Sequence, residues 1–334
     1  MKAAICTGYG KIEDVVEVRD IKKPVVLQND VLIKVHAASV NPIDIKEAKG
    51  DLKNVRKRAF PYTMGLDVSG VVVEAGSGTS KFKVGDEVYS RVDSDRCGTF
   101  AEYSAVDEKF VARKPQNISH TEAAAVPLAG LTAWQCMFDA AGMKSGQKIL
   151  IHAGSGGVGT IAIQIAKSFG AHVATTTSTS NVDLVTQLGA DIVVDYKKQR
   201  FDEVLRDYDV VLETLGGENQ VRSFSVLKNG GYLVSIVGIP SAEWAKSQNL
   251  PFYMPLLFGF LNRKNNQLAR QKKAGFDMVL MQPNAEQLGK ITDLIERDEL
   301  RPVIDREFSL DEVQEALSYL QTGRAKGKIV INAA

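Results

Sequence analysis

The stretch IHAGSGGVGT, residues 151–160, constrains the fold more than any other part of the sequence. An apolar run ends at Ile151, and small and aliphatic residues repeat at helical spacing after the glycines. Gly154, Gly156 and Gly159 therefore satisfy the G-x-G-x-x-G pattern at a strand-to-helix junction, the context in which it indicates dinucleotide binding. Such glycines permit a tight turn, the approach of a pyrophosphate and close helix packing. The alternative is a glycine turn in another kind of α/β domain.

After this motif, β-branched runs alternate with helical segments. The runs AHVATTT, ADIVVDY, YDVVLETLG and GGYLVSIVG are separated by stretches typical of helices. With the strand at 148–152 they predict a doubly wound parallel sheet with helices on both faces. FDMVLMQ, near 276–282, is a candidate for a sixth strand.

Length and charge limit the kinds of protein that this chain can be. Its 334 residues suggest two domains, and a formal net charge of +1 provides no global attraction to nucleic acid or to an anionic membrane. Its 3 cysteines include no C-x-x-C pair, and no secretory signal is evident, so we expect a reduced, cytoplasmic setting. The apolar run at 251–261 is shorter than the roughly 20 residues that span a bilayer, which favours a pocket lid or a subunit interface.

The first third of the chain is rich in short strand candidates. MKAAIC, DVLIKVHAASV, GLDVSGVVVEAG, GDEVYSRV and GTFAEYSAV are separated by Gly, Asp and Asn-Pro turns, a pattern that suits antiparallel strands in a compact barrel. An alanine-rich helix after residue 119 indicates the domain boundary. Helix-like and strand-like segments alternate again after residue 284.

Several motifs together resemble one protein family over essentially the whole chain. They are SVNPID, GLDVSGVVVEAG, VGDEVYS, GTFAEY, AAAVPLAGLTAW, HAGSGGVGTIAIQIAK, LGADIVVDY and GRAKGKIVI. They resemble the zinc-free quinone oxidoreductase and enone reductase branch of the medium-chain dehydrogenase/reductase superfamily. The resemblance implies an α/β protein with a GroES-like β-rich catalytic domain, residues 1–122 and 285–334, around a Rossmann domain, residues 123–284. It also implies a homodimer, with the edge strand near 276–281 as a candidate contact.

The ligands of the zinc-dependent relatives are missing at the matching positions. Those relatives use a Cys early in the first domain and a later His-Glu pair, whereas this chain has Asn41 and Asp44 for the first and Leu66 and Asp67 for the second. Asn and Leu are not zinc ligands of the usual kind. Cys97 is alone where a structural zinc would need four cysteines. We therefore predict no metal.

NADPH is the predicted cofactor. An NAD site normally has an acid about 20 residues after the first glycine, but VATTTSTSN holds none before Asp183. A 2′-phosphate would then bind through the hydroxyl-rich loop and a nearby lysine such as Lys197; the alternative is that this loop is only solvated. The predicted cofactor-binding residues, several of them implied by the resemblance, are Thr132, Gly154, Ser155, Gly156, Gly157, Val158, Gly159, Ser178, Ser180, Asn181, Tyr196, Gly238 and Lys328.

The resemblance suggests Asn41, Lys46 and Tyr62 as catalytic residues, because the family places the Asn-Pro turn at the floor of the cleft. Plant alkenal and enone reductases carry lysine at the position of Lys46, where zeta-crystallin-type quinone reductases carry tyrosine. Lys46 is either a donor to a substrate or ribose oxygen or an exposed charge on a short helix. Tyr62 lines the cleft or is a turn aromatic, and Asp44 is more typical of a turn or cap.

Together these features predict NADPH-dependent reduction of enones, alkenals or quinones by hydride transfer without a metal. The substrate would be a small hydrophobic electrophile. Two alternatives remain: an NADPH-binding sensor or structural protein without turnover, and an RNA-binding protein. The second rests on NRKNNQLARQKK, residues 262–273, although a basic run of this size is more often a solvated helix face.

Overall fold

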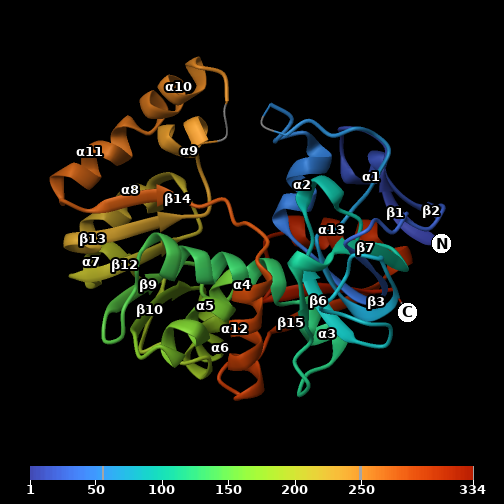
Figure 1. Ribbon diagram of the computed structural model, residues 1–334. Helices are drawn as coiled ribbons and strands as arrows, with labels where there is room; N and C mark the ends of the chain where they lie inside the picture. Colours follow the sequence, from blue (N-terminus) through green and yellow to red (C-terminus); the bar gives the residue numbers. More distant parts are fainter. Residues whose placement is uncertain (55, 248–249, 334) are drawn as a thin grey trace. The chain divides into compact units, whose positions relative to one another are not determined.

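The computed structural model describes residues 1–54, 56–247 and 250–333 (Figure 1). The chain divides into two compact units. Unit 1 contains Met1–Leu131 and Gln282–Ala334, and unit 2 contains Thr132–Met281. Helix α4 (Pro127–Trp134) runs through the first of the two boundaries.

Unit 1 is rich in β structure and uses both ends of the chain. A three-stranded antiparallel sheet has the order β2-β1-β4, and a seven-stranded sheet has the order β15-β16-β3-β5-β6-β8, with β7 paired to β3. Strand β16 pairs antiparallel with β3, so the C-terminal strand completes a sheet that begins near the N-terminus. The strands are β1 (Lys2–Cys6), β2 (Val16–Asp20), β3 (Asp30–Val40), β4 (Tyr62–Thr63), β5 (Asp67–Ala75), β6 (Glu87–Arg91), β7 (Tyr103–Asp107), β8 (Val111–Arg113), β15 (Ile304–Ser309) and β16 (Lys328–Asn332).

This arrangement differs from one compact antiparallel barrel in two ways. The strands form two sheets, and β15 runs parallel to β16. A parallel pair needs a crossover connection, and α13 (Val313–Gln321) provides it. The other helical segments of unit 1 are α1 (Ile12–Val15), α2 (Pro42–Lys49), η1 (Ser94–Arg96), η2 (Glu108–Phe110), α3 (His120–Ala124), α12 (Ala285–Glu296) and η5 (Leu310–Glu312).

Unit 2 contains the predicted parallel sheet, which confirms the α/β fold class. All its strand pairs are parallel, in the order β11-β10-β9-β12-β13-β14. The candidate sixth strand is present as β14. The strands are β9 (Lys148–Ile151), β10 (His172–Thr177), β11 (Ile192–Asp195), β12 (Tyr208–Glu213), β13 (Leu227–Ser235) and β14 (Gly275–Met278).

The strand order determines on which face of the sheet each connecting helix of unit 2 is expected. The chain moves outward from β9 to β10 and β11, and then returns to the other side of β9 at β12. Right-handed crossovers in opposite directions place their helices on opposite faces of the sheet. The helices are η3, a π-helix (Gln135–Ala140), α5 (Gly157–Ser168), η4 (Thr179–Asn181), α6 (Val182–Gln187), α7 (Phe201–Val204), α8 (Gly217–Val226), α9 (Ala242–Ser247), α10 (Tyr253–Leu261) and α11 (Arg263–Gln271).

The reversal of strand order between β9 and β12 marks the place where ligands of open α/β sheets bind, outside the carboxyl ends of the strands. The segments that follow β9, β10, β11, β12 and β13 all emerge at this edge because the strands are parallel. The glycine-rich turn, residues 152–156, is the segment that follows β9.

Candidate active site

The three glycines of the turn have different surroundings. A Cβ at Gly154 would lie 2.0 Å from the hydroxyl oxygen of Thr175, and one at Gly159 would lie 2.3 Å from the carbonyl oxygen of Ala153. A Cβ at Gly156 would meet only the Ala153 carbonyl, at 3.3 Å. Gly154 and Gly159 therefore serve internal packing, whereas Gly156 leaves a space that a ligand can approach. The left-handed residue of the turn is Ala153, with φ of 50°, and not the first glycine.

Helix α5 begins directly behind this space. Gly156 is its N-cap residue and provides no side-chain cap. The first N–H groups of a helix have no acceptor within the helix, and together with the helix dipole they favour an anion. The turn thus has both the room and the donors that a pyrophosphate group needs.

A hydroxyl-rich loop adjoins the glycine turn. The hydroxyl oxygen of Ser155 accepts hydrogen bonds from the Thr177 hydroxyl and from the Asn181 side-chain amide, each at 3.0 Å. The hydroxyl oxygens of Ser178 and Ser180 lie 3.3 Å apart; Ser178 is half-buried and Ser180 is exposed. The structure therefore brings the predicted serines and Asn181 together beside the turn.

The end of β11 lies next to this loop. Tyr196 is 61% exposed, and its backbone N–H donates to the carbonyl of Thr177. Asp195 accepts a hydrogen bond from the Thr179 hydroxyl at 2.7 Å and pairs with Lys198 at 3.5 Å. The Thr179 bond in particular lowers the pKa of Asp195. Asp195 is thus an ionised carboxylate whose charge is partly compensated by its own neighbours.

The buried side chain of His152 lies beside the glycine-rich turn, between β10 and α8. The ring nitrogens of His152 lie 3.1 Å from the Thr176 hydroxyl and 2.9 Å from the Ser223 hydroxyl. Burial lowers the pKa of His152 to about 4, so the ring is neutral at physiological pH. The Thr176 hydroxyl also accepts the backbone N–H of Ala153. His152 therefore acts as a structural residue.

Glu213 organises the ends of β12 and β13. Its carboxylate accepts the backbone N–H groups of Leu215 and Gly216 at 2.8 Å, and the Ser235 hydroxyl at 3.1 Å. Burial raises its pKa. Gly238 follows β13 with φ of 111°, a conformation that favours glycine, so this predicted residue also lies at the carboxyl edge of the sheet.

The Asn-Pro turn of unit 1 contains a fully buried polar cluster. Asp67, with no exposed surface, accepts the Ser39 hydroxyl at 2.8 Å, the Asn41 amide at 2.9 Å and the Leu128 backbone N–H at 2.8 Å. The Lys328 ammonium group donates to the side-chain amide oxygen (Oδ1) of Asn41 at 2.5 Å and lies 3.5 Å from the Asp67 carboxylate. The predicted residues Asn41 and Lys328 thus meet each other in this buried cluster.

These bonds use most of the hydrogen-bonding capacity of Asn41. Its amide nitrogen donates to both Ser39 and Asp67, and its amide oxygen accepts from Lys328. An amide has two donor hydrogens, so none is left for a substrate. We therefore expect Asn41 to hold the turn in place.

Asp44 lies in the first turn of helix α2 and takes part in the cap of its N-terminus. Its carboxylate accepts the backbone N–H of Asn41 at 2.8 Å, the reciprocal bond of an N-terminal cap, and Pro42 occupies the first turn. Burial raises the pKa of Asp44 to about 8, against the effect of that hydrogen bond. At neutral pH the group is mostly a protonated carboxylic acid.

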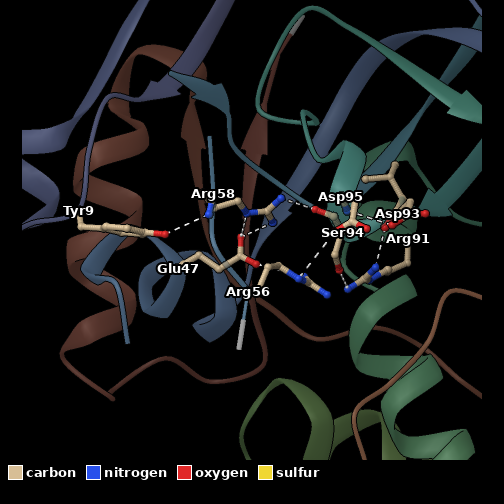
Figure 2. Close-up of polar contacts among 9 residues, drawn as sticks. Tyr9, Glu47, Arg56, Arg58, Arg91, Asp93, Ser94 and Asp95 are labelled. Atoms are coloured by element: carbon tan, nitrogen blue, oxygen red, sulfur yellow. Dashed lines mark hydrogen bonds and ion pairs between the residues drawn. The ribbon is translucent and has the colours of Figure 1, made fainter. Parts of the chain in front are cut away.

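One side of helix α2 is held by a buried ion pair, and its other side faces solvent. Glu47 is buried and forms an ion pair with the guanidinium group of Arg58. Arg58 also donates to the Ser94 carbonyl, and Arg91 donates to the Ser94 hydroxyl at 2.6 Å, as Figure 2 shows. Lys46 is exposed on the same helix. The network therefore anchors the helix that carries the predicted donor.

Tyr62, Cys6 and Cys97 belong to unit 1, and Cys136 belongs to unit 2. The Tyr62 hydroxyl is buried and has no hydrogen-bond partner in the described part of the chain, and burial raises its pKa. Burial also raises the pKa of Cys97 to about 12 and raises the pKa values of Cys6 and Cys136. Tyr62 is thus a neutral, buried hydroxyl beside the Cys6 thiol.

The remaining predictions divide between the two units. Unit 2 holds the glycine turn, the serine loop, Tyr196 and Gly238 at one sheet edge, and Thr132 lies buried on α4. Lys328 and the catalytic candidates belong to unit 1. Within residues 1–54, 56–247 and 250–333, no three His, Cys, Asp or Glu side chains are grouped so that they could hold a metal ion.

Asp195, Glu213 and Glu47 organise the site but were not predicted from the sequence. Asp195 and Glu213 each end an apolar strand, in IVVD and VVLE. An acid in this position was a usable signal, because such residues lie at the ligand-binding edge of a parallel sheet. Glu47 carried no such signal, since its partner Arg58 is brought to it by a loop.

Two family models match this chain. One is described as "Zinc-binding dehydrogenase" and matches residues 188–331. The other is described as "Alcohol dehydrogenase GroES-like domain" and matches residues 27–116.

Named relatives are similar over almost the whole chain. A 2-methylene-furan-3-one reductase from Solanum lycopersicum is 38% identical over 99% of this chain and 79% of its own length. An NADPH-dependent alkenal/one oxidoreductase, chloroplastic, from Arabidopsis thaliana is 35% identical with the same coverage, 99% and 79%. The solved structure of a quinone oxidoreductase from Coxiella burnetii is 34% identical, covers 100% of this chain and 99% of its own, and superposes with a TM-score of 0.85.

Proposed function

Because the chain belongs to the quinone oxidoreductase and enone reductase branch of the medium-chain dehydrogenase/reductase superfamily, we propose that it reduces activated C=C bonds of enones and alkenals, or quinones, with NADPH. It is a nicotinamide-dependent oxidoreductase that acts on small apolar electrophiles. The observation that carries the proposal is the space at Gly156, which opens at the N-terminus of α5 in a chain similar to named enone reductases.

The residues around that space fit NADPH. Ser155, Ser178, Ser180 and Asn181 offer hydroxyl and amide groups to a 2′-phosphate. Asp195 on the neighbouring strand is occupied by Thr179 and Lys198, which reduces its repulsion of a phosphate. We therefore expect a higher kcat/KM with NADPH than with NADH. Equal values, or a higher value with NADH, would contradict this preference.

Bound NADPH supplies the hydride for this reaction. Hydride addition to the β-carbon of an enone moves the C=C electrons toward the carbonyl oxygen, where negative charge develops. Hydrogen-bond donors suffice to stabilise such delocalised charge. Lys46, exposed on an anchored helix, donates to that oxygen, and a proton from solvent reaches the α-carbon. The buried Tyr62 hydroxyl stays the second candidate donor that the family resemblance suggests.

The proposed reaction uses no zinc. Leu66 has no donor atom, and the Asn41 amide is committed to Ser39, Asp67 and Lys328. A simple ketone would need more stabilisation of a localised alkoxide than hydrogen bonds from these groups provide, and zinc relatives supply it with their metal. We therefore expect no alcohol dehydrogenase activity.

Isotope transfer tests the reaction directly. With C4-deuterated NADPH and an α,β-unsaturated ketone, deuterium should be found at the β-carbon of the saturated product. Deuterium on the carbinol carbon of an allylic alcohol would show reduction of the carbonyl instead. NADPH binding without oxidation by enones, alkenals or quinones would favour the sensor alternative.

Assembly and location are part of the proposal. We expect a homodimer, since β14 is an edge strand of its sheet. Sedimentation at micromolar concentration checks this, and a monomer would contradict it. Among the described residues no helix is long and apolar enough to cross a membrane. The cytoplasmic location stays a prediction, to be checked by imaging of the tagged protein.

A further inference from the structure

Helix α10 exposes a continuous apolar stripe. Phe252, Leu256 and Phe260 follow each other at four-residue spacing and are 86%, 72% and 59% exposed. A second row, one position further along, contains Tyr253, Leu257 and Leu261, which are also exposed. Residues four apart lie on one face of a helix, so these two rows form one stripe. A helix of a globular protein usually turns such a stripe inward, but here only Phe258 is buried.

The next helix, α11, presents positive charge. Arg263, Lys264 and Arg270 lie on α11, and Lys273 follows its C-terminal end. All four are exposed, and none forms an ion pair with another described residue. Residues 250–276 include no acid that could compensate them. In Figure 1 the two helices follow each other directly.

The apolar and charged parts meet at one point and continue into a groove. The guanidinium group of Arg263 lies over the ring of Phe260, 4.6 Å from its centre. An open groove of about 500 Å³, lined by Lys246, Leu250, Phe252, Pro255 and Leu256, extends the apolar surface towards α9. Among the described residues that line it, the charged one is Lys246.

We propose that α10 and α11 form a docking surface for anionic lipid, on which the protein lies without crossing the bilayer. Helices that lie in the membrane interface combine exposed aromatic and aliphatic residues with lysine and arginine. Here α10 would enter the headgroup region, and the cations of α11 would contact lipid phosphates. This inference rests on surface residues alone and does not depend on the proposed reaction.

Charge decides between lipid and the other possible occupants. A second copy in a symmetric interface would bring two cationic α11 helices towards each other without compensating acids. RNA would use the cations but would leave the aliphatic residues Leu256, Leu257 and Leu261 in water. An anionic lipid surface satisfies both parts of the docking surface.

Vesicle flotation tests the proposal with the whole protein. We expect flotation with vesicles of about 70% phosphatidylcholine and 30% phosphatidylglycerol, and much less with pure phosphatidylcholine. Raising KCl from about 0.1 M to about 1 M shortens the Debye length from about 10 Å to about 3 Å and should release the protein. Lys264→Gln, Arg270→Gln and Lys273→Gln together should weaken partitioning about a hundredfold, since each cation contributes about fivefold.

Matched variants separate the surface from general effects. Phe252→Ser, Leu256→Ser and Phe260→Ser together should abolish flotation, whereas Val25→Ser, Leu27→Ser and Val84→Ser, equally exposed in unit 1, should not. The charge control is Lys81→Gln, Lys83→Gln and Lys326→Gln, which lie in unit 1 and are also exposed. Thermal melting and NADPH binding verify that each variant is folded.

Three outcomes would overturn the proposal. One is equal flotation with both lipid mixtures, or none with either. Another is concentration-dependent self-association that the triple serine variant in α10 removes while flotation is absent. The third is salt-dependent RNA binding that the triple glutamine variant in α11 removes, again without flotation.

Discussion

Gly156→Ala separates cofactor binding from folding, because only this position of the glycine triplet has room for a Cβ. The N-cap residue has φ of −84° and ψ of 174°, an extended conformation that alanine adopts freely. The new methyl group would meet only the Ala153 carbonyl oxygen, at 3.3 Å. Alanine restricts the unfolded chain, a gain of about 0.4–1 kcal/mol, and is a poorer N-cap by a similar amount. We therefore expect a change in unfolding free energy below about 1 kcal/mol.

The cofactor should respond much more strongly. The methyl group would occupy the space through which a phosphate oxygen reaches the N–H groups of α5. Loss of one hydrogen bond to a charged group costs about 1.5–3 kcal/mol. The Kd for NADPH should rise by about 10- to 150-fold. Fluorescence titration of NADPH and urea unfolding of the cofactor-free protein measure the two quantities separately.

Gly154→Ala is the matched control. Its Cβ would lie 2.0 Å from the Thr175 hydroxyl oxygen inside the packed turn, so it should lower the unfolding free energy by at least about 1–3 kcal/mol. The reasoning would be refuted if Gly156→Ala bound NADPH with unchanged affinity. It would also be refuted if Gly156→Ala destabilised the protein as much as Gly154→Ala does.

Three further predictions concern unit 1. Lys328→Met leaves Asp67 without its cation and should lower the unfolding free energy by about 3–5 kcal/mol in urea; unchanged stability with weaker NADPH binding would instead make Lys328 a cofactor ligand. Asp44, with its pKa raised to about 8, binds its proton more tightly in the folded protein than in the unfolded chain. Its contribution to the unfolding free energy therefore falls as pH rises from about 4 to 8, by at most about 1.4 kcal/mol per pH unit. Asp44→Asn should remove this part of the slope, and urea midpoints that keep the same pH dependence in the variant would contradict the assignment. Lys46→Ala should lower kcat/KM for enones without changing the melting temperature, while Lys49→Ala, another exposed lysine of α2, should not; equal rates in both variants would remove Lys46 from the mechanism.

The parallel sheet was predictable because its signals are local. Strands β9, β10, β11 and β12 contain short runs of β-branched residues, and the glycine pattern marks the turn after β9 without knowledge of any distant residue. The reason for Gly154 was not predictable, since it depends on Thr175 of the neighbouring strand. The motif predicted a tight turn at the first glycine, room for a pyrophosphate at the second and helix packing at the third. Only the role of Gly154 differs, because it packs against Thr175 while Ala153 takes the left-handed conformation.

The buried cluster of unit 1 was beyond local reasoning. Lys328 and Asn41 are 287 positions apart and meet only because β16 pairs with β3. No periodicity within either strand indicates that pairing; it came from the family resemblance. The mostly neutral state of Asp44 was hidden for a similar reason, because its pKa depends on complete burial among residues from several segments.

The protonated thiols have a consequence for a protein that meets electrophiles at every turnover. Enones and alkenals alkylate thiolates, and a thiol with a pKa of about 12, such as Cys97, is ionised in about one molecule in 10⁵ at pH 7. Cys97 itself is half-buried, whereas Cys6 and Cys136 are buried. The same packing that keeps these thiols protonated therefore makes the enzyme a poor target for alkylation by its own substrates.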